Sequence, residues 1–342
     1  MTSKQFLRTA IVILAVLAIS LPVISQDEAK KKAKKEARVE EAASFPAVLT
    51  QDPGDISSLD LYYGAGGKQL APSASETFTF VDEDLHQTSP KFDVTDSQGR
   101  RWRAKLGPEP QAETAATRLV WAAGYFVNND YYLDQIKVDD LPTLKRGERF
   151  VTKDGMVRRV RLELKPKSIK SIGTWPWSQN PFAGTRELNG LRVMMALMNN
   201  WDMITRNNYI YDEDGQRRYL VSDLGASFGR SGNDLTRSKG KMEDYVHSKF
   251  IARTTPDTVD FVIHARPLPI TIIEPHYYED LVHGQEVFKH IPRADARWMG
   301  QRLAQLSDSQ IRDCFRAAGF SPEEIDGYTT TVHERIAELN AL

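Results

Sequence analysis

Two strand-like runs around an Asp-Gly turn constrain the fold of this chain more than any other feature. The runs are Asn207–Tyr211 and Arg218–Ser222, and Asp214-Gly215 lies between them. Asp-Gly is a strong signal for a tight hairpin turn because both central positions tolerate a positive φ. The sequence therefore predicts a β-hairpin over residues 207–222.

Pairing outward from this turn brings polar residues together at the open end of the hairpin. Asn207 falls opposite Ser222 and next to Asp223, and Asp202 stands five positions before Asn207. Amide and carboxylate oxygens are the hard ligands that suit Mg²⁺. A further carboxylate can orient or deprotonate a hydroxyl, so the set matches what phosphoryl transfer requires. We expect Asn207 and Asp223 to bind metal and Asp202 to be catalytic.

A second hairpin upstream carries a lysine near its end. The strands are predicted over Lys91–Thr95 and Arg100–Leu106, with Lys105 in the second strand. A helix is predicted over Gln111–Tyr125 because its small and apolar residues recur at helical spacing, and Glu113 lies in its first turn. A strand lysine held by a helix glutamate can be kept on the phosphates of a nucleotide.

These positions resemble those of the protein-kinase-like superfamily, especially its atypical branches. Those branches are the HipA-like kinases, the phosphatidylinositol 3- and 4-kinases, and the exported or secretory-pathway kinases. The resemblance covers roughly residues 75–340 and rests on five positions, in the order Lys105, Glu113, Asp202, Asn207 and Asp223. It implies an α+β, two-lobed fold whose N-lobe is an antiparallel sheet with one helix and whose C-lobe is mostly helical.

The resemblance also implies a role for each residue. Lys105 would position the α- and β-phosphates of ATP, and Glu113 would hold Lys105, with Glu109 as a second candidate partner. Asp202 would orient the acceptor, while the metal-binding pair would hold Mg²⁺. Ser89 and Lys91 lie in the best candidate for a phosphate-covering turn, and we expect both to contact the nucleotide.

The chain departs from typical protein kinases at several of these motifs. Asn200-Trp201-Asp202 stands where they have His-Arg-Asp, and Asp223-Leu224-Gly225 where they have Asp-Phe-Gly. No lysine stands two residues after Asp202, and no Gly-x-Gly-x-x-Gly precedes Lys105. Two other readings therefore remain open: a kinase-fold binding protein without catalysis, and an AMP transferase that uses the same metal site.

Composition is that of an ordinary globular protein and excludes few classes. Hydrophobic residues make up 41% and charged residues 27%, with a formal net charge of −1. This balance leaves no basic excess for a nucleic-acid partner. No motif for acyl transfer or zinc hydrolysis occurs. The expected partners are a nucleotide and a protein, lipid or polysaccharide acceptor that the sequence does not specify.

The first residues have the pattern of an export signal. Lys4 and Arg8 precede the apolar run Thr9–Val23, and a cleavage site follows Ser25. We expect an exported protein, periplasmic or secreted; the alternative is an uncleaved N-terminal membrane anchor. The single cysteine, Cys314, cannot form an intramolecular disulfide, so the core alone must hold the domain.

A charged segment follows the apolar run and is predicted to be a solvated helix or tether. Six basic residues lie between Lys30 and Arg38, and this stretch could contact an anionic membrane surface. Basic residues directly after an apolar run also favour retention in the cytoplasm, which opposes export. The expected organisation is a signal peptide at 1–25, a tether at 26–46, an N-lobe at 47–172 and a C-lobe at 173–342.

The remaining patterns fill in the two lobes. A strand is predicted over Met156–Leu164, and Thr185 is expected to cap a helix ending near Met198. Helices are predicted to close the chain at Ala294–Leu306, Asp308–Ala318 and Pro322–Leu339. His276, Asp280 and His283 fall on one predicted helix face, where they could bind a transition metal.

Overall fold

The computed structural model of the 342-residue chain describes all residues except 1–25, 87–88, 167, 234, 264 and 267–282. The predicted signal peptide and two of the candidate metal ligands, His276 and Asp280, thus lie outside the described residues. The chain divides into two compact units, Met1–Phe45 and Pro46–Leu342. In the first unit the predicted charged helix is present as α2 (Gln26–Ala43). Among the described residues, no helix has the length and apolar character needed to cross a membrane.

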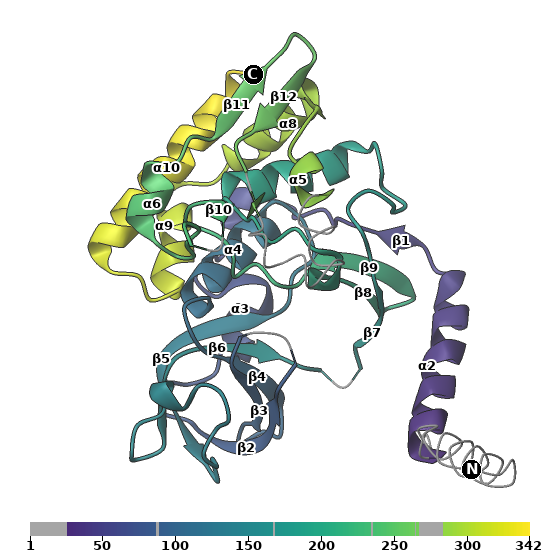
Figure 1. Cartoon of the computed structure of the whole chain (residues 1–342), viewed down its shortest axis with the longest axis vertical. Coiled ribbons are helices and arrows are strands. Elements are labelled where there is room, and N and C mark those ends of the chain that lie inside the picture. The colour runs from purple at the N-terminus through teal and green to yellow at the C-terminus, as the bar shows by residue number, and fades with distance from the viewer. Residues whose placement is uncertain (1–25, 87–88, 167, 234, 264, 267–282) are drawn as a thin grey trace, which may run out of the picture. The chain divides into compact units, whose positions relative to one another are not determined.

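A closed β-barrel forms one half of the second unit (Figure 1). Its strands, in the order around the barrel, are β2 (Thr77–Asp84), β3 (Lys91–Thr95), β4 (Arg101–Lys105), β6 (Met156–Leu164) and β5 (Asp130–Asp139). The strands predicted from the sequence are confirmed. Neighbours pair antiparallel except β2 and β5, which pair parallel and close the barrel. This closure differs from the expected antiparallel sheet, and it leaves no strand edge unpaired.

Helix α4 (Pro110–Ala122) follows β4 directly. Pro110 opens it, which costs no hydrogen bond because the first N–H groups of a helix lack intrahelical partners. Ala112, Ala116 and Leu119 are fully buried in the larger of the two hydrophobic clusters, against the helical half of the protein. The helix that carries Glu113 is therefore packed on both the barrel and the helical half.

A four-stranded sheet contains the predicted hairpin. Its order is β1 (Ala47–Val48), β9 (Gln216–Val221), β8 (Asn208–Glu213) and β7 (Lys170–Thr174). The hairpin prediction is confirmed: Asn208 pairs with Val221, and Asp214 and Gly215 have φ of 53° and 70°. Strand β1 pairs with β9. Leu49, the residue after β1, is buried in the hydrophobic cluster of the helical half.

The helical half contains the predicted long helices. Thr185 caps α5 (Arg186–Leu197) by accepting a hydrogen bond from the backbone N–H of Leu188. The closing helices are α8 (Arg293–Leu303), α9 (Asp308–Ala317) and α10 (Pro322–Asn340), and the last two begin with complete capping boxes. The fold class is the predicted one: α+β, with two lobes of which the C-terminal one is mostly helical.

Short elements complete the described structure. The small strands are β10 (Gly232–Asn233), β11 (Ile251–Thr254), β12 (Thr258–Phe261), β13 (Ala265–Arg266) and β14 (Ile291–Pro292). The short helices are η1 (Ile56–Ser58), η2 (Gly64–Gly66), α3 (Gly67–Leu70), η3 (Glu148–Phe150), η4 (Thr205–Asn207) and α6 (Met242–Val246).

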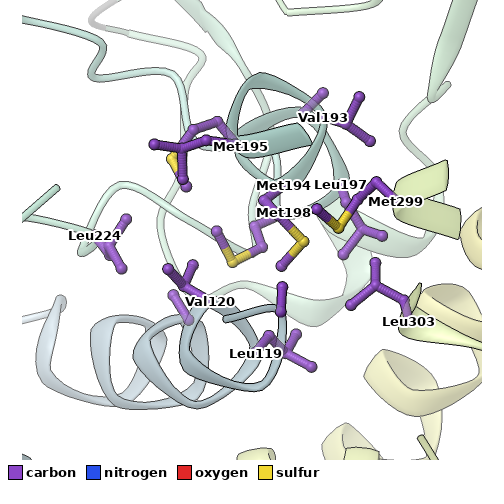
Figure 2. Packing of buried hydrophobic residues seen from close by; sticks show 14 of the residues in the cluster. Leu119, Val120, Val193, Met194, Met195, Leu197, Met198, Leu224, Met299 and Leu303 are labelled. Carbon is purple, nitrogen blue, oxygen red and sulfur yellow. The ribbon is translucent and has the colours of Figure 1, made fainter. Parts of the chain in front are cut away.

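The core of the helical half is apolar and rich in methionine. Figure 2 shows side chains from α4, α5 and α8 meeting there, with Leu224 from the loop after β9 beside them. Met194, Met195 and Met198 are fully buried among these residues. Unbranched thioether side chains fill irregular gaps between helices, so these methionines have a packing role. The packing fixes the end of α5, from which the segment containing Asp202 continues.

Candidate active site

Lys105 lies at the centre of a cluster of three carboxylates. Its Nζ is 2.6 Å from Oε2 of Glu109, 2.8 Å from Oε2 of Glu113 and 3.0 Å from Oδ1 of Asp223. Both glutamates that the sequence offered as partners are thus in contact with it. Burial by itself lowers the pKa of Lys105, but Asp223, Glu113 and Glu109 together raise the pKa well above its ordinary value. The lysine is charged, and β4 and α4 hold it beside Asp223.

A second layer of buried charges supports Glu113. Its Oε1 lies 3.4 Å from Nη1 of Arg161, which faces Lys105 in the register of β4 and β6. Arg161 also contacts Asp130 at 2.6 Å and Glu163 at 2.9 Å. Burial raises the pKa of Glu113 to about 7 although Arg161 and Lys105 lower it. Both cations therefore oppose protonation of this carboxylate.

Arg161 and two of its acidic partners, Asp130 and Glu163, were not predicted from the sequence. The available signal in the sequence was that Arg161 and Glu163, two opposite charges two positions apart, alternate with the apolar residues of the predicted strand Met156–Leu164. A buried charge needs a partner of opposite sign, because desolvating an isolated ion costs several kcal/mol. Such a pattern could have indicated an ion-paired interior.

Asp202 and Asn207 are in direct contact within the loop after α5. Nδ2 of Asn207 donates to the backbone oxygen and to Oδ2 of Asp202, both at 3.1 Å. Oδ1 of Asp202 is buried and has no hydrogen-bond partner in the described part of the chain. Burial, and then Asp223, raise the pKa of Asp202. A desolvated carboxylate oxygen of this kind is a stronger base than one exposed to water.

Asn207 and Asp223 lie at the open end of the hairpin, as predicted. The backbone N–H of Ser222 donates to the oxygen of Asn207 at 2.8 Å, which continues the β8–β9 ladder by one step. Both side chains line a cleft of about 430 Å³ together with Lys91, Lys105 and Glu113. The cleft lining does not include Ser89, which instead donates from Oγ to Oε2 of Glu109 at 2.9 Å.

Among the described residues of this site, two sets of oxygens could hold a divalent metal. Glu109, Glu113 and Asp223 have carboxylate oxygens within 4.8 Å of one another, but the ammonium of Lys105 contacts all three. Asn207 directs its amide nitrogen at Asp202, which leaves the amide oxygen for another partner. The Asp223 side chain is 30% exposed. Asn207 with Asp223 therefore fits a metal better than the three-carboxylate cluster does.

Gly225 packs closely against Glu109 and contacts Asp223. Its backbone N–H donates to Oδ1 of Asp223 at 3.3 Å. A Cβ at Gly225 would lie 2.7 Å from Cβ of Glu109, which real side chains do not tolerate. The glycine of the Asp-Leu-Gly motif is thus required by the close contact with Glu109.

The cleft has more positive than negative groups. Its basic residues are Lys91, Arg103, Lys105, Arg161, Lys165 and Arg206, and its acidic residues are Asp84, Glu113, Glu163 and Asp223. Tyr209 and Tyr211 also line it, with ring planes 16° apart and centroids 6.0 Å apart. Cationic groups with two aromatic rings suit a polyanionic ligand that carries a planar base.

Comparisons with known proteins give distant likenesses. No protein-family model and no curated protein sequence matches the chain. It is similar to a proinflammatory kinase of Helicobacter pylori, at 10% identity and a TM-score of 0.43, covering 78% of this chain and 96% of that chain. It is also similar to the Golgi casein kinase with Mn and ADP bound, at 10% identity and a TM-score of 0.41, covering 80% of this chain and 73% of that chain. These neighbours are kinases, but likenesses at this level add no support to a particular reaction.

Proposed function

We propose that this protein transfers the terminal phosphate of ATP to a hydroxyl group, with Mg²⁺ as cofactor. The observation that carries the proposal is the convergence of the Lys105 cluster with Asn207 and Asp223 around one cationic cleft. Asp202 does not itself line this cleft, but its carboxylate contacts Asn207, which does. The acceptor class, whether protein, lipid or polysaccharide, is not specified by the described side chains.

Each side chain has a definable part in this reaction. The ammonium of Lys105, kept in place by Glu113 and Arg161, would bind the α- and β-phosphates. Asn207 and Asp223 would hold Mg²⁺, which when bound neutralises charge on the phosphate oxygens. The carboxylate of Asp202, which contacts the cleft residue Asn207, would orient the acceptor hydroxyl.

The transfer forms one bond at the γ-phosphorus and breaks another. The hydroxyl oxygen of the acceptor forms a bond to the γ-phosphorus, and the bond between that phosphorus and the β,γ-bridging oxygen breaks. The bridging oxygen keeps the electron pair and leaves with ADP. The hydroxyl proton passes to the carboxylate of Asp202, which holds it until product release.

Assays with ATP that carries a radioactive label on either the γ- or the α-phosphate distinguish phosphate transfer from AMP transfer. Transfer of γ-label to an acceptor supports the proposal, whereas transfer of α-label shows AMP transfer. Binding of ATP without either transfer, across protein, lipid and polysaccharide acceptors, shows a kinase-fold binding protein. Asp202→Asn should retain Mg-ATP binding and lose roughly 10²- to 10⁴-fold in transfer rate. Asp154→Asn, at an exposed residue, is the matched control.

We also propose that the protein is exported and cleaved near Ser25. The basic start, the apolar run and the small residue at the cleavage point support this. A reporter that is active only after export, fused behind Leu342, measures it. Reporter activity confined to the cytoplasm would overturn export without affecting the proposed reaction.

A further inference from the structure

The segment after the Asp-Leu-Gly motif returns to the site and brings a second lysine with it. Nζ of Lys239 forms an ion pair with Oε1 of Glu109, whose other oxygen contacts Lys105. Nζ of Lys239 also lies 5.1 Å from the ring centroid of Trp201, the residue before Asp202. A single carboxylate thus links two ammonium groups, those of Lys105 and Lys239.

Backbone hydrogen bonds fix Lys239 at this position. The N–H groups of Ser238, Gly240 and Lys241 donate to carbonyl oxygens in the stretch 227–230, at 2.8 to 3.0 Å. The indole N–H of Trp201 donates to the backbone oxygen of Ser238 at 3.3 Å. Both neighbours of Lys239 are therefore held, and its side chain, 26% exposed, points at Glu109.

The proposed reaction needs a cation where the phosphate is transferred. The transferred group is itself anionic, and Asp202 and Asp223 add negative charge beside it. Lys105 is already shared among three carboxylates. Of the residues between Asp202 and Asn207, Met203, Ile204 and Thr205 are uncharged, and Arg206 is basic and lines the cleft.

We propose that Lys239 is a second phosphate-binding lysine, which holds the terminal phosphate of ATP beside Asp202. Its ammonium remains protonated and donates hydrogen bonds to the γ-phosphate oxygens while the phosphorus moves to the acceptor. Glu109 is a positioning residue: it receives Lys239 on one oxygen and Lys105 on the other. This inference rests on the proposed function and assigns the place of the γ-phosphate.

The preference for ATP over ADP isolates this contact, since only ATP carries a γ-phosphate. In Lys239→Met, we expect affinity for Mg-ATP to fall about tenfold and affinity for Mg-ADP to stay the same. The single-turnover transfer rate should fall at least as far. Lys239→Arg, which keeps the charge, should restore most of the ATP preference. Lys241→Met is the control, because Lys241 is on the same segment but pairs with Asp244 at 3.5 Å.

The outcomes separate the inference from the proposed function. If wild-type protein transfers phosphate and Lys239→Met keeps the wild-type ATP preference and rate, the inference is wrong and the reaction stands. If wild-type protein binds no Mg-ATP, both are wrong. An equal loss of ATP and ADP affinity in Lys239→Met also contradicts the inference, because it would indicate a general disturbance of the site.

Discussion

The interior behind Lys105 consists of charged side chains, whereas the interior behind Asp202 consists of apolar and aromatic ones. Behind Lys105, Arg161 is buried with three carboxylates, those of Glu113, Asp130 and Glu163. Asp130 also contacts a second arginine, Arg118, at 2.6 Å. Behind Asp202, the interior is apolar and aromatic: Phe315 and Tyr328 stack with centroids 4.8 Å apart and planes 8° apart. The charged interior holds Glu113 and, through it, the ammonium of Lys105 in place. The aromatic interior holds the backbone of the loop that carries Asp202.

A buried arginine, Arg335, links the aromatic interior to the start of the Asp202 loop. Nη1 of Arg335, on α10, donates to the backbone oxygen of Leu197 at 2.8 Å and to Oδ1 of Asn199 at 3.0 Å. Its guanidinium lies 4.2 Å from the ring centroid of Tyr245. The end of α5 is thereby joined to the last helix of the chain. Ion pairs depend on every partner, whereas apolar packing depends mainly on volume, so the two interiors should respond differently to mutation.

Arg161→Met should have the largest effect, because it leaves Glu113, Asp130 and Glu163 without their shared cation. We expect a loss of up to about 5 kcal/mol in the free energy of unfolding, and weaker Mg-ATP binding by the protein that remains folded. Chemical denaturation and calorimetric titration measure the two effects. Arg158→Met, at an exposed position of the same strand, should change both only slightly.

Phe315→Ala should cost about 4 kcal/mol in the free energy of unfolding, since it empties space among buried rings. In contrast to Arg161→Met, affinity for Mg-ATP below the melting temperature should be unchanged. Leu235→Ala, at a side chain that is 82% exposed, provides the control. A large loss of nucleotide affinity in Phe315→Ala would show that the two interiors are not separable.

The charged interior should also lose stability in acid through Glu163. Burial alone raises the pKa of Glu163, but Lys165 and Arg161 lower it to about 2, from an ordinary value of 4.5. Because the folded state holds the proton less tightly than the unfolded state does, this contribution is present above pH 4.5. It is lost as the pH falls from 4.5 toward 2, and its full size is roughly 3 kcal/mol.

Glu163→Gln tests this pH dependence. The difference in melting temperature between wild type and Glu163→Gln should be large at pH 7 and should shrink below pH 4.5. A difference that is constant across this range would contradict the assignment of a depressed pKa to Glu163.

The smallest effect is expected from a local interaction in the helical half. Ser321 caps α10, and its side chain accepts from the backbone N–H of Glu324 while Glu324 accepts from that of Ser321. Ser321→Ala should cost about 1 kcal/mol in the free energy of unfolding, with no change in nucleotide binding. A loss as large as that of Phe315→Ala would mean that the start of α10 contributes to the aromatic interior.

Interactions between near neighbours could be predicted from the sequence. The Asp214-Gly215 turn requires positive φ at both residues, and both have it. The caps at Thr185 and Ser321 lie within three residues of the groups they satisfy. Once the hairpin register follows from the turn, the proximity of Asn207 to Asp223 follows as well, because each strand step is fixed by its hydrogen bonds.

Contacts between distant segments were decided only by the tertiary structure. The sequence offered Glu109 and Glu113 as alternative partners of Lys105, and the folded chain uses both. The bond from Lys105 to Asp223 spans 118 residues, and that from Lys239 to Glu109 spans 130. The parallel pairing of β2 with β5 also joins strands far apart in the chain.

The sequence by itself determined the local elements and the order of the chemical groups along the chain. It did so because turns, caps and helical faces depend on side chains a few residues apart. The tertiary structure decided which charges share one buried site, since Coulomb interactions and desolvation depend on distance and burial in space. The packing of α4 against the segment that follows Gly225 joins Lys105, Glu109 and Lys239 into one connected site.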